Sequence, residues 1–165
     1  MAAYEAAGWG GFGTTAATAA ATLTGLLFIA VSINLKQILE AESLPGRAAM
    51  TLLFFAIPLV ASLLLVVPAQ TRTVLGAELV ATGAVGGVSA LVIGRRAGRS
   101  QYEPRWSLLC TRLIPMAGSC LFVIVAGVSE VAGAGGGLYW LVPATVLAIA
   151  AGLVNTWVLL VEIMR

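Results

Sequence analysis

The chain contains five long apolar stretches, separated by short breaks that are rich in Gly, Pro or charged residues. An α-helix needs about 20 apolar residues to cross a hydrocarbon core of about 30 Å, and each stretch is near or above that length. The predicted spans cover residues 14–39, 47–67, 73–94, 106–131 and 138–164. Backbone polar groups in lipid must bond within their own segment, so these spans are expected to be helical. The pattern predicts an all-α, polytopic transmembrane bundle that forms one domain over residues 1–165.

The third span has the weakest pattern, because it is rich in Gly and Ala and contains Glu78. The basic residues support it. With five spans and an external N-terminus, only Arg72 lies outside, as the positive-inside rule expects. The other basic residues then lie at or near the cytoplasmic side: Lys36, Arg47, Arg95, Arg96, Arg99, Arg105, Arg112 and Arg165. The C-terminus is therefore predicted to be cytoplasmic.

The N-terminal tail predicts an uncleaved anchor rather than a signal peptide. Its only side-chain charge is Glu5, and no basic segment precedes the first span. The use of eight Arg and one Lys, with abundant Ala and Gly, is typical of a bacterial protein with a GC-rich gene. We expect a multi-pass protein of the bacterial cytoplasmic (inner) membrane, with the lipid bilayer as its main partner.

Composition agrees with a membrane protein and excludes several kinds of chemistry. The chain is 60% hydrophobic and 10% charged, with a mean hydropathy of +1.02, whereas soluble domains carry about 25% charged residues. It contains no His and no Asp, which excludes histidine-ligated haem, Ser-His or Cys-His catalysis and two-Asp proteolysis. Cys110 and Cys120 are expected to be small buried hydrophobes. We therefore predict no enzyme activity, no cofactor and no metal site, and the net charge of +2 does not suggest nucleic-acid binding.

Ionisable groups inside a membrane are costly, at about 2.5–3.5 kcal/mol on insertion scales, so they need partners or water. Glu78 lies within the third span, where Arg72 or a Ser or Thr of the first span is its expected partner. Glu130 lies at the outer end of the fourth span. A second group is expected at the inner side and consists of Asn34, Lys36, Arg112, Asn155 and Glu162. We expect Glu162 to pair with Arg112 or Lys36. A structural clamp and a cytoplasmic vestibule or ion site are the two interpretations of this group.

Small residues predict where helices cross closely, since lipid provides no hydrophobic force between helices. The third span has a face of small residues that includes the GxxxG pair Gly83 and Gly87, and its other members are Gly76, Ala90 and Gly94. The first span has a stripe made of Gly11, Thr15, Thr18, Thr22 and Gly25. These faces favour packing within the chain, and a homo-oligomer interface is the alternative. Pro58 and Pro115 are expected to kink the second and fourth spans.

Three segments carry a resemblance to a group of proteins. They are FIAVSINL at 28–35, LPGRA at 44–48 and NTWVLLVE at 155–162. With them the chain resembles small uncharacterised multi-pass membrane proteins of actinobacteria. This resemblance implies a membrane location and no functional residues. We expect a non-enzymatic membrane protein that acts through protein or lipid contacts, as an accessory subunit, and the alternative is a small oligomeric ion or solute channel or transporter.

Overall fold

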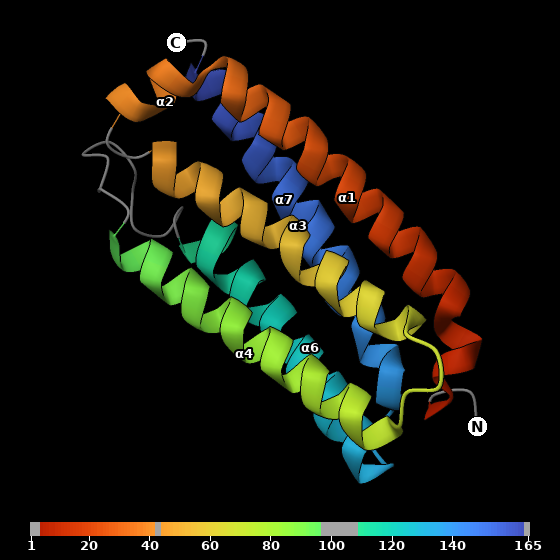
Figure 1. Ribbon diagram of the computed structural model, residues 1–165. Helices are drawn as coiled ribbons and strands as arrows, with labels where there is room; N and C mark the ends of the chain where they lie inside the picture. Colours follow the sequence, from red (N-terminus) through yellow and green to blue (C-terminus); the bar gives the residue numbers. More distant parts are fainter. Residues whose placement is uncertain (1–3, 42–43, 97–108, 164–165) are drawn as a thin grey trace.

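A computed structural model describes residues 4–41, 44–96 and 109–163 of the chain. Every regular element in these residues is helical (Figure 1). The long helices are α1 (Gly10–Ile33), α3 (Leu44–Val66), α4 (Arg72–Arg96), α6 (Ile114–Ala132) and α7 (Leu141–Ile163). The shorter elements are η2 (Ala6–Trp9), α2 (Leu35–Glu40), the π-helical turn η3 (Leu109–Leu113) and η4 (Gly137–Trp140).

Five helical segments are long and apolar enough to cross a membrane, which confirms the five predicted spans. They cover Gly10–Ile33, Leu44–Val66, Arg72–Arg96, Thr111–Ala132 and Gly137–Glu162. The third span is among them, with 25 residues, despite its weak pattern. Most predicted bounds differ by a few residues at the ends, where capping and loop contacts decide the last turn. Residues 106–108 and 164, which the prediction placed in spans, lie outside the described residues.

The prediction of an unbroken first span to residue 39 is wrong. α1 ends at Ile33, and the short helix α2 follows Asn34, whose φ of −106° and ψ of 19° are not helical. The Asn34 side-chain amide donates to the carbonyl oxygen of Ala30 at 2.8 Å. This bond competes with the backbone for a helical acceptor, which is how Asn interrupts helices.

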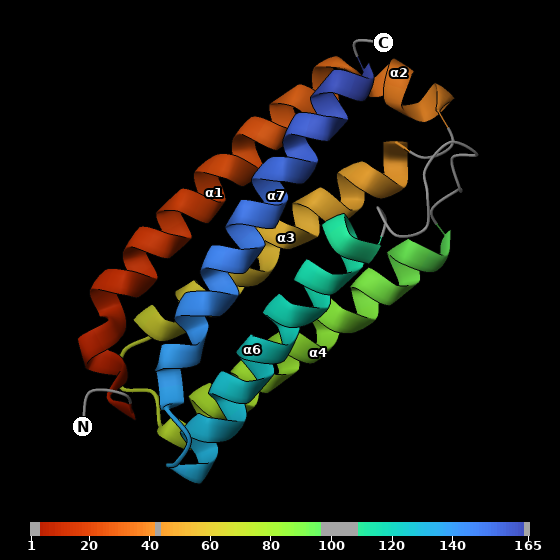
Figure 2. The ribbon, with the colours of Figure 1, turned by 180° about the vertical axis from the view of Figure 1, so that it is seen from behind.

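α3 lies at the centre of the bundle and packs against α1, α4 and α7. α4 and α6 form a close pair on one side, and α1 and α7 lie on the other side (Figures 1 and 2). The core contains large side chains of α3 and α4, including the fully buried Phe54, Phe55 and Leu79. The two ends of the chain lie at opposite ends of the bundle (Figure 1). This arrangement follows from an odd number of antiparallel spans.

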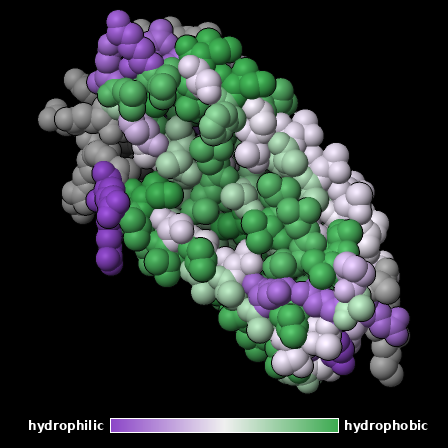
Figure 3. All heavy atoms as spheres, viewed as in Figure 1, coloured by the Kyte–Doolittle hydropathy of each residue, from purple (hydrophilic) through white to green (hydrophobic). Residues whose placement is uncertain are grey.

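The outer surface of the bundle suits a lipid environment. Large apolar side chains such as Phe28, Val85 and Trp157 are more than half exposed. In Figure 3, apolar residues cover the middle of the visible face, and the hydrophilic residues gather toward the two ends. Exposed apolar surface of this extent is stable only against lipid or another apolar surface.

The closest helix crossing is the one between α4 and α6, and glycine makes it possible. A Cβ atom on Gly76 would lie 2.6 Å from the carbonyl oxygen of Gly127, and one on Gly127 would lie 2.5 Å from that of Gly76. Gly83 also faces α6, where a Cβ would lie 2.8 Å from the carbonyl oxygen of Cys120. The prediction for Gly83 is thus confirmed. Gly87 takes no part in a crossing within the chain, because a Cβ there would meet nothing within 4 Å, and Gly86 faces Ile57 of α3 instead.

The predicted stripe of the first span does not pack within the chain. Gly11 and Gly25 have open space beside them, and Thr15, Thr18 and Thr22 are exposed. α1 packs on α3 through a different face, which consists of Gly13, Ala16, Ala17 and Ala20. Both faces carry small residues, so residue size alone does not distinguish them.

Candidate functional site

The polar residues of the spans form two groups at opposite ends of the bundle. We call the group near the 133–137 hairpin the hairpin-end cluster, and it consists of Tyr4, Gln70, Arg72, Glu78, Ser129 and Glu130. We call the group where α3 begins and α7 ends the C-terminal-end cluster, and it consists of Arg47, Arg112, Asn155 and Glu162.

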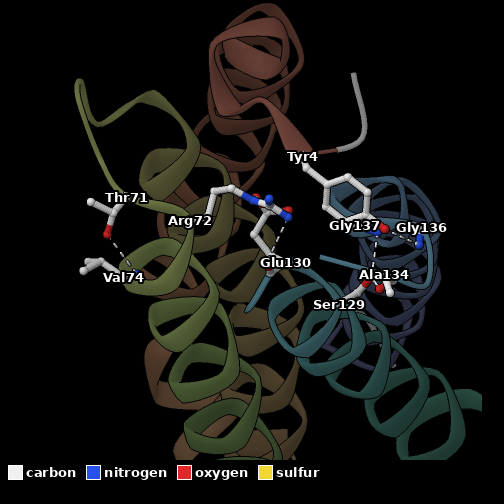
Figure 4. A network of polar contacts seen from close by, with 9 residues as sticks. All are labelled: Tyr4, Thr71, Arg72, Val74, Ser129, Glu130, Ala134, Gly136 and Gly137. Atoms are coloured by element: carbon white, nitrogen blue, oxygen red, sulfur yellow. Dashed lines mark hydrogen bonds and ion pairs between the residues drawn. The ribbon is translucent and has the colours of Figure 1, made fainter. Parts of the chain in front are cut away.

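Arg72 and Glu130 form the centre of the hairpin-end cluster. Arg72 Nε donates to Glu130 Oε1 at 3.3 Å, and Arg72 Nη2 donates to the backbone carbonyl of Glu130 at 3.3 Å. The Glu130 side chain is 0% exposed and that of Arg72 is 50% exposed. The guanidinium also lies 4.8 Å from the centre of the Tyr4 ring, which is a favourable cation–π distance. Arg72 thus links the start of α4 to the end of α6 and to the N-terminal segment (Figure 4).

Ser129 holds the 133–137 hairpin in place (Figure 4). Its hydroxyl donates to the carbonyl oxygen of Ala134 and accepts from the N–H of Gly137 at 2.7 Å. Gly133, Gly135, Gly136 and Gly137 all have positive φ values, which only glycine adopts readily. The hydroxyl of Tyr4 accepts from the N–H of Gly136 at 3.0 Å. The hairpin between α6 and α7 therefore contacts the N-terminal segment.

Glu78 does not contact either of its expected partners. Gln70, in the turn before α4, donates from Nε2 to Glu78 Oε2. Arg72 is engaged with Glu130 instead, and the described residues show no bond from Glu78 to α1. The expectation failed because Arg72 and Glu78 are six residues apart, which places them on different sides of a helix. Gln70 had no sequence signal beyond its place in a polar break.

A cavity of about 480 Å³ opens beside Arg72 and Glu130. Its walls come from the N-terminal segment, the end of α3, the turn that follows it, and the first residues of α4. Tyr4, Glu5, Gln70, Arg72 and Glu130 supply its polar part. The prediction placed Arg72 and Glu130 at this end, but the contribution of Tyr4 and Gln70 depends on how the N-terminal segment folds back, which periodicity does not show.

In the C-terminal-end cluster, Glu162 pairs with Arg47. Arg47 Nη1 lies 2.5 Å from Glu162 Oε2, and the side chains are 5% and 34% exposed, respectively. The expected pairing of Glu162 with Arg112 or Lys36 is wrong. Lys36 is exposed on α2, while α3 and α7 pack side by side and bring Arg47 to Glu162. The available signal was a basic residue at the first position of the predicted second span, 47–67.

Asn155 and Arg112 lie at this end as predicted, and both are buried. Asn155 Nδ2 donates to the carbonyl oxygens of Thr111 and Ala151, each at 2.9 Å. Thr111 lies four residues before Pro115, which has no N–H to donate to it as a helical residue would. Asn155 therefore donates to a carbonyl to which Pro115, four residues further on, has no N–H to donate. Asn34 is bonded within α1, and no described interaction joins it to Glu162.

The part of the chain that the structure describes has no group of three or more His, Cys, Asp or Glu side chains placed to hold a metal ion. Searches against protein families, curated proteins and solved structures found no match for this chain. The resemblance to actinobacterial membrane proteins thus stays a prediction, and the chemistry of the site rests on its own geometry.

Proposed function

We propose that this protein is a non-enzymatic membrane protein that acts through contacts with other membrane components, as an accessory subunit of a larger assembly. We further propose that it lies in the cytoplasmic membrane of a bacterium, with the hairpin-end cluster outside and the C-terminal-end cluster at the cytoplasmic side. The second proposal rests on the positive-inside distribution of the basic residues.

The observation that carries the first proposal is the separation of the polar clusters by an apolar layer. Between them the core contains Phe54, Ile57, Leu79, Val123 and Ala148, all buried. Ions and polar solutes cross a membrane along hydrogen-bonding or charged groups. Buried hydroxyls at this depth are bonded to the backbone, for example Thr51 to the carbonyl of Arg47 and Ser119 to that of Ala144. They support helix packing rather than a solute path.

Ion flux through liposomes tests this function against the channel or transporter alternative. Purified protein in sealed liposomes is expected to give no flux above protein-free liposomes. A reproducible flux that Glu78→Ala abolishes, and that Glu40→Ala at an exposed site leaves unchanged, would overturn the proposal in favour of a channel.

Photo-crosslinking in native membranes tests the accessory role directly. A photoreactive residue replaces Phe28 on α1 or Trp157 on α7, which are 63% and 69% exposed. An accessory subunit is expected to give one discrete protein adduct from one of these faces. Adducts to lipid alone from both positions would contradict the accessory role.

A further inference from the structure

The cavity at the hairpin-end cluster combines an apolar wall with a polar end. Leu65, Val66, Val67 and Leu75 form the apolar part, and the polar part lies around Arg72 and Glu130. Its volume of about 480 Å³ is in the range of small-molecule sites, about 300–1,000 Å³. The end of α3 and the start of α4 place it at the end of the bundle, where a span leaves the hydrocarbon.

Two buried oxygen atoms of residues that line this cavity lack a hydrogen-bond partner among the described residues. They are Glu130 Oε2 and Gln70 Oε1. Arg72 engages only the other carboxylate oxygen of Glu130. The Gln70 amide nitrogen faces Glu78, so its carbonyl oxygen is the atom left over. A buried acceptor is stabilised by a donor, and both of these atoms have the capacity to accept one.

The charges of the cavity favour a cationic donor. Glu5 and Glu130 contribute two negative charges and Arg72 one positive charge, so the ionisable lining has one negative charge in excess. Arg72 is already committed to Glu130 and to the Tyr4 ring. A bare Ca²⁺ or Mg²⁺ ion takes about six or more oxygen ligands, and an apolar wall does not supply them. An organic cation with N–H groups fits both parts of the cavity.

We propose that this cavity binds a primary ammonium group attached to an apolar chain. Glu130 Oε2 and Gln70 Oε1 accept its N–H bonds, and the ends of α3 and α4 hold its apolar part. The bound group adds to the bond that Arg72 makes with the other carboxylate oxygen of Glu130. This site goes beyond the proposed accessory role and does not depend on it.

Thermal unfolding with matched amines tests the proposal. Protein in dodecyl maltoside, which contains no amine, is titrated with n-hexylammonium or with n-hexyltrimethylammonium. The two probes share their charge and chain, but only the first has N–H donors. We expect a saturable rise of the unfolding midpoint with n-hexylammonium and none with n-hexyltrimethylammonium. An equal response to both probes, or no response to either, would overturn the proposal.

Variants locate the site. Glu130→Gln removes the charge at nearly constant shape and is expected to weaken n-hexylammonium binding about tenfold or more, since bonds to charged groups are the stronger ones. Gln70→Leu, in the turn before α4, gives a second test if Glu130→Gln fails to fold. Glu40→Gln, at the opposite end of the bundle, is expected to bind as the wild type does. Unchanged binding in Glu130→Gln or Gln70→Leu would contradict the assignment.

The ammonium group could belong to a lipid headgroup or to a water-soluble amine, and lipid analysis distinguishes these two sources. The protein is reconstituted in bilayers of equal phosphatidylethanolamine and phosphatidylcholine, extracted, and examined for retained lipid by native mass spectrometry. Selective retention of the ethanolamine lipid that Glu130→Gln abolishes assigns a lipid headgroup. Saturable n-hexylammonium binding without such retention assigns a water-soluble amine. Retention of both lipids alike, together with equal effects of the two amine probes, rejects an ammonium site.

Discussion

Arg47 illustrates how a charged residue is kept inside this bundle. It lies in the first turn of α3 with a side chain that is 5% exposed, and Glu162 of α7 lies 2.5 Å away. A buried ion pair adds little net stability compared with apolar residues, because both charges lose their hydration. It becomes important when one partner is removed, since the other charge then stays buried with one interaction fewer.

We therefore expect Glu162→Ala to lower the free energy of unfolding by about 1–3 kcal/mol. Breaking a fully buried pair costs about 3–5 kcal/mol, and the 34% exposure of Glu162 reduces this value. The double variant Arg47→Leu/Glu162→Leu is expected to recover much of the loss. Denaturant unfolding in mixed micelles measures both, with the exposed Glu40→Ala as the control. A double variant as unstable as Glu162→Ala would contradict the clamp.

Asn155 gives a second prediction at this scale, because its amide donates to the carbonyl of Thr111, four residues before Pro115, which has no N–H of its own. Asn155→Leu is expected to cost about 1–2 kcal/mol of unfolding free energy, the range of a hydrogen bond inside a membrane. In a Pro115→Ala background, residue 115 has its own N–H, so the cost of Asn155→Leu is expected to fall. Equal costs in the two backgrounds, measured by the same unfolding titration, would show that the two residues act independently.

At the scale of elements, the α4–α6 crossing depends on Gly76 and Gly127, whose Cβ positions would clash with the partner's backbone. Backbone atoms cannot move aside as a flexible side chain does. Gly127→Ala is thus expected to separate the helices and cost about 1–3 kcal/mol, as overpacking does elsewhere. Gly87→Ala, with open space around it, is expected to be neutral or stabilising by about 0.5–1 kcal/mol. Unfolding titrations measure the free energy of unfolding of the two variants. Equal losses in Gly127→Ala and Gly87→Ala would contradict a close α4–α6 crossing at Gly127.

Sequence patterns predict the spans of this chain well and their contacts poorly. Hydropathy identified all five spans because the requirement to cross about 30 Å of hydrocarbon acts on each segment alone. The GxxxG pattern selected Gly83 and Gly87, whereas the crossing uses Gly76, Gly83 and Gly127. The face that a glycine-rich helix presents to its neighbour depends on the rotation of both helices, and that rotation is set by the whole bundle.

The dependence of contacts on the whole bundle also explains why the partners of the buried carboxylates could not be predicted from the sequence. That Glu162 and Glu130 need cationic partners follows from their place in apolar sequence. Which cation lies beside each carboxylate depends on the neighbouring helix. α3 packs against α7, so Arg47 pairs with Glu162. The start of α4 lies beside the end of α6, so Arg72 pairs with Glu130. Lys36, Arg47 and Arg112 all lie at the same predicted end of the spans, and only the arrangement of helices distinguishes them as partners of Glu162.

At the scale of the whole molecule, the two ends of the bundle differ in charge, and this difference predicts its orientation. Arg95, Arg96 and Lys36 are exposed at the end where α4 terminates and α2 lies, whereas Arg72 is at the other end. Basic residues are retained on the cytoplasmic side during insertion. Single cysteines are introduced at the exposed positions Ala134 and Gln37, after Cys110 and Cys120 have been replaced by Ala.

An impermeant maleimide added to intact cells is expected to label the cysteine at position 134 and to spare the one at position 37. Permeabilised cells are expected to give labelling at both positions, which controls for access to each thiol. The result bears on the whole molecule, because the loops between five successive spans alternate sides, so the side of one loop fixes the side of every other. Labelling at 37 and protection at 134 in intact cells would invert the orientation, and would place the ammonium cavity on the cytoplasmic side of the membrane.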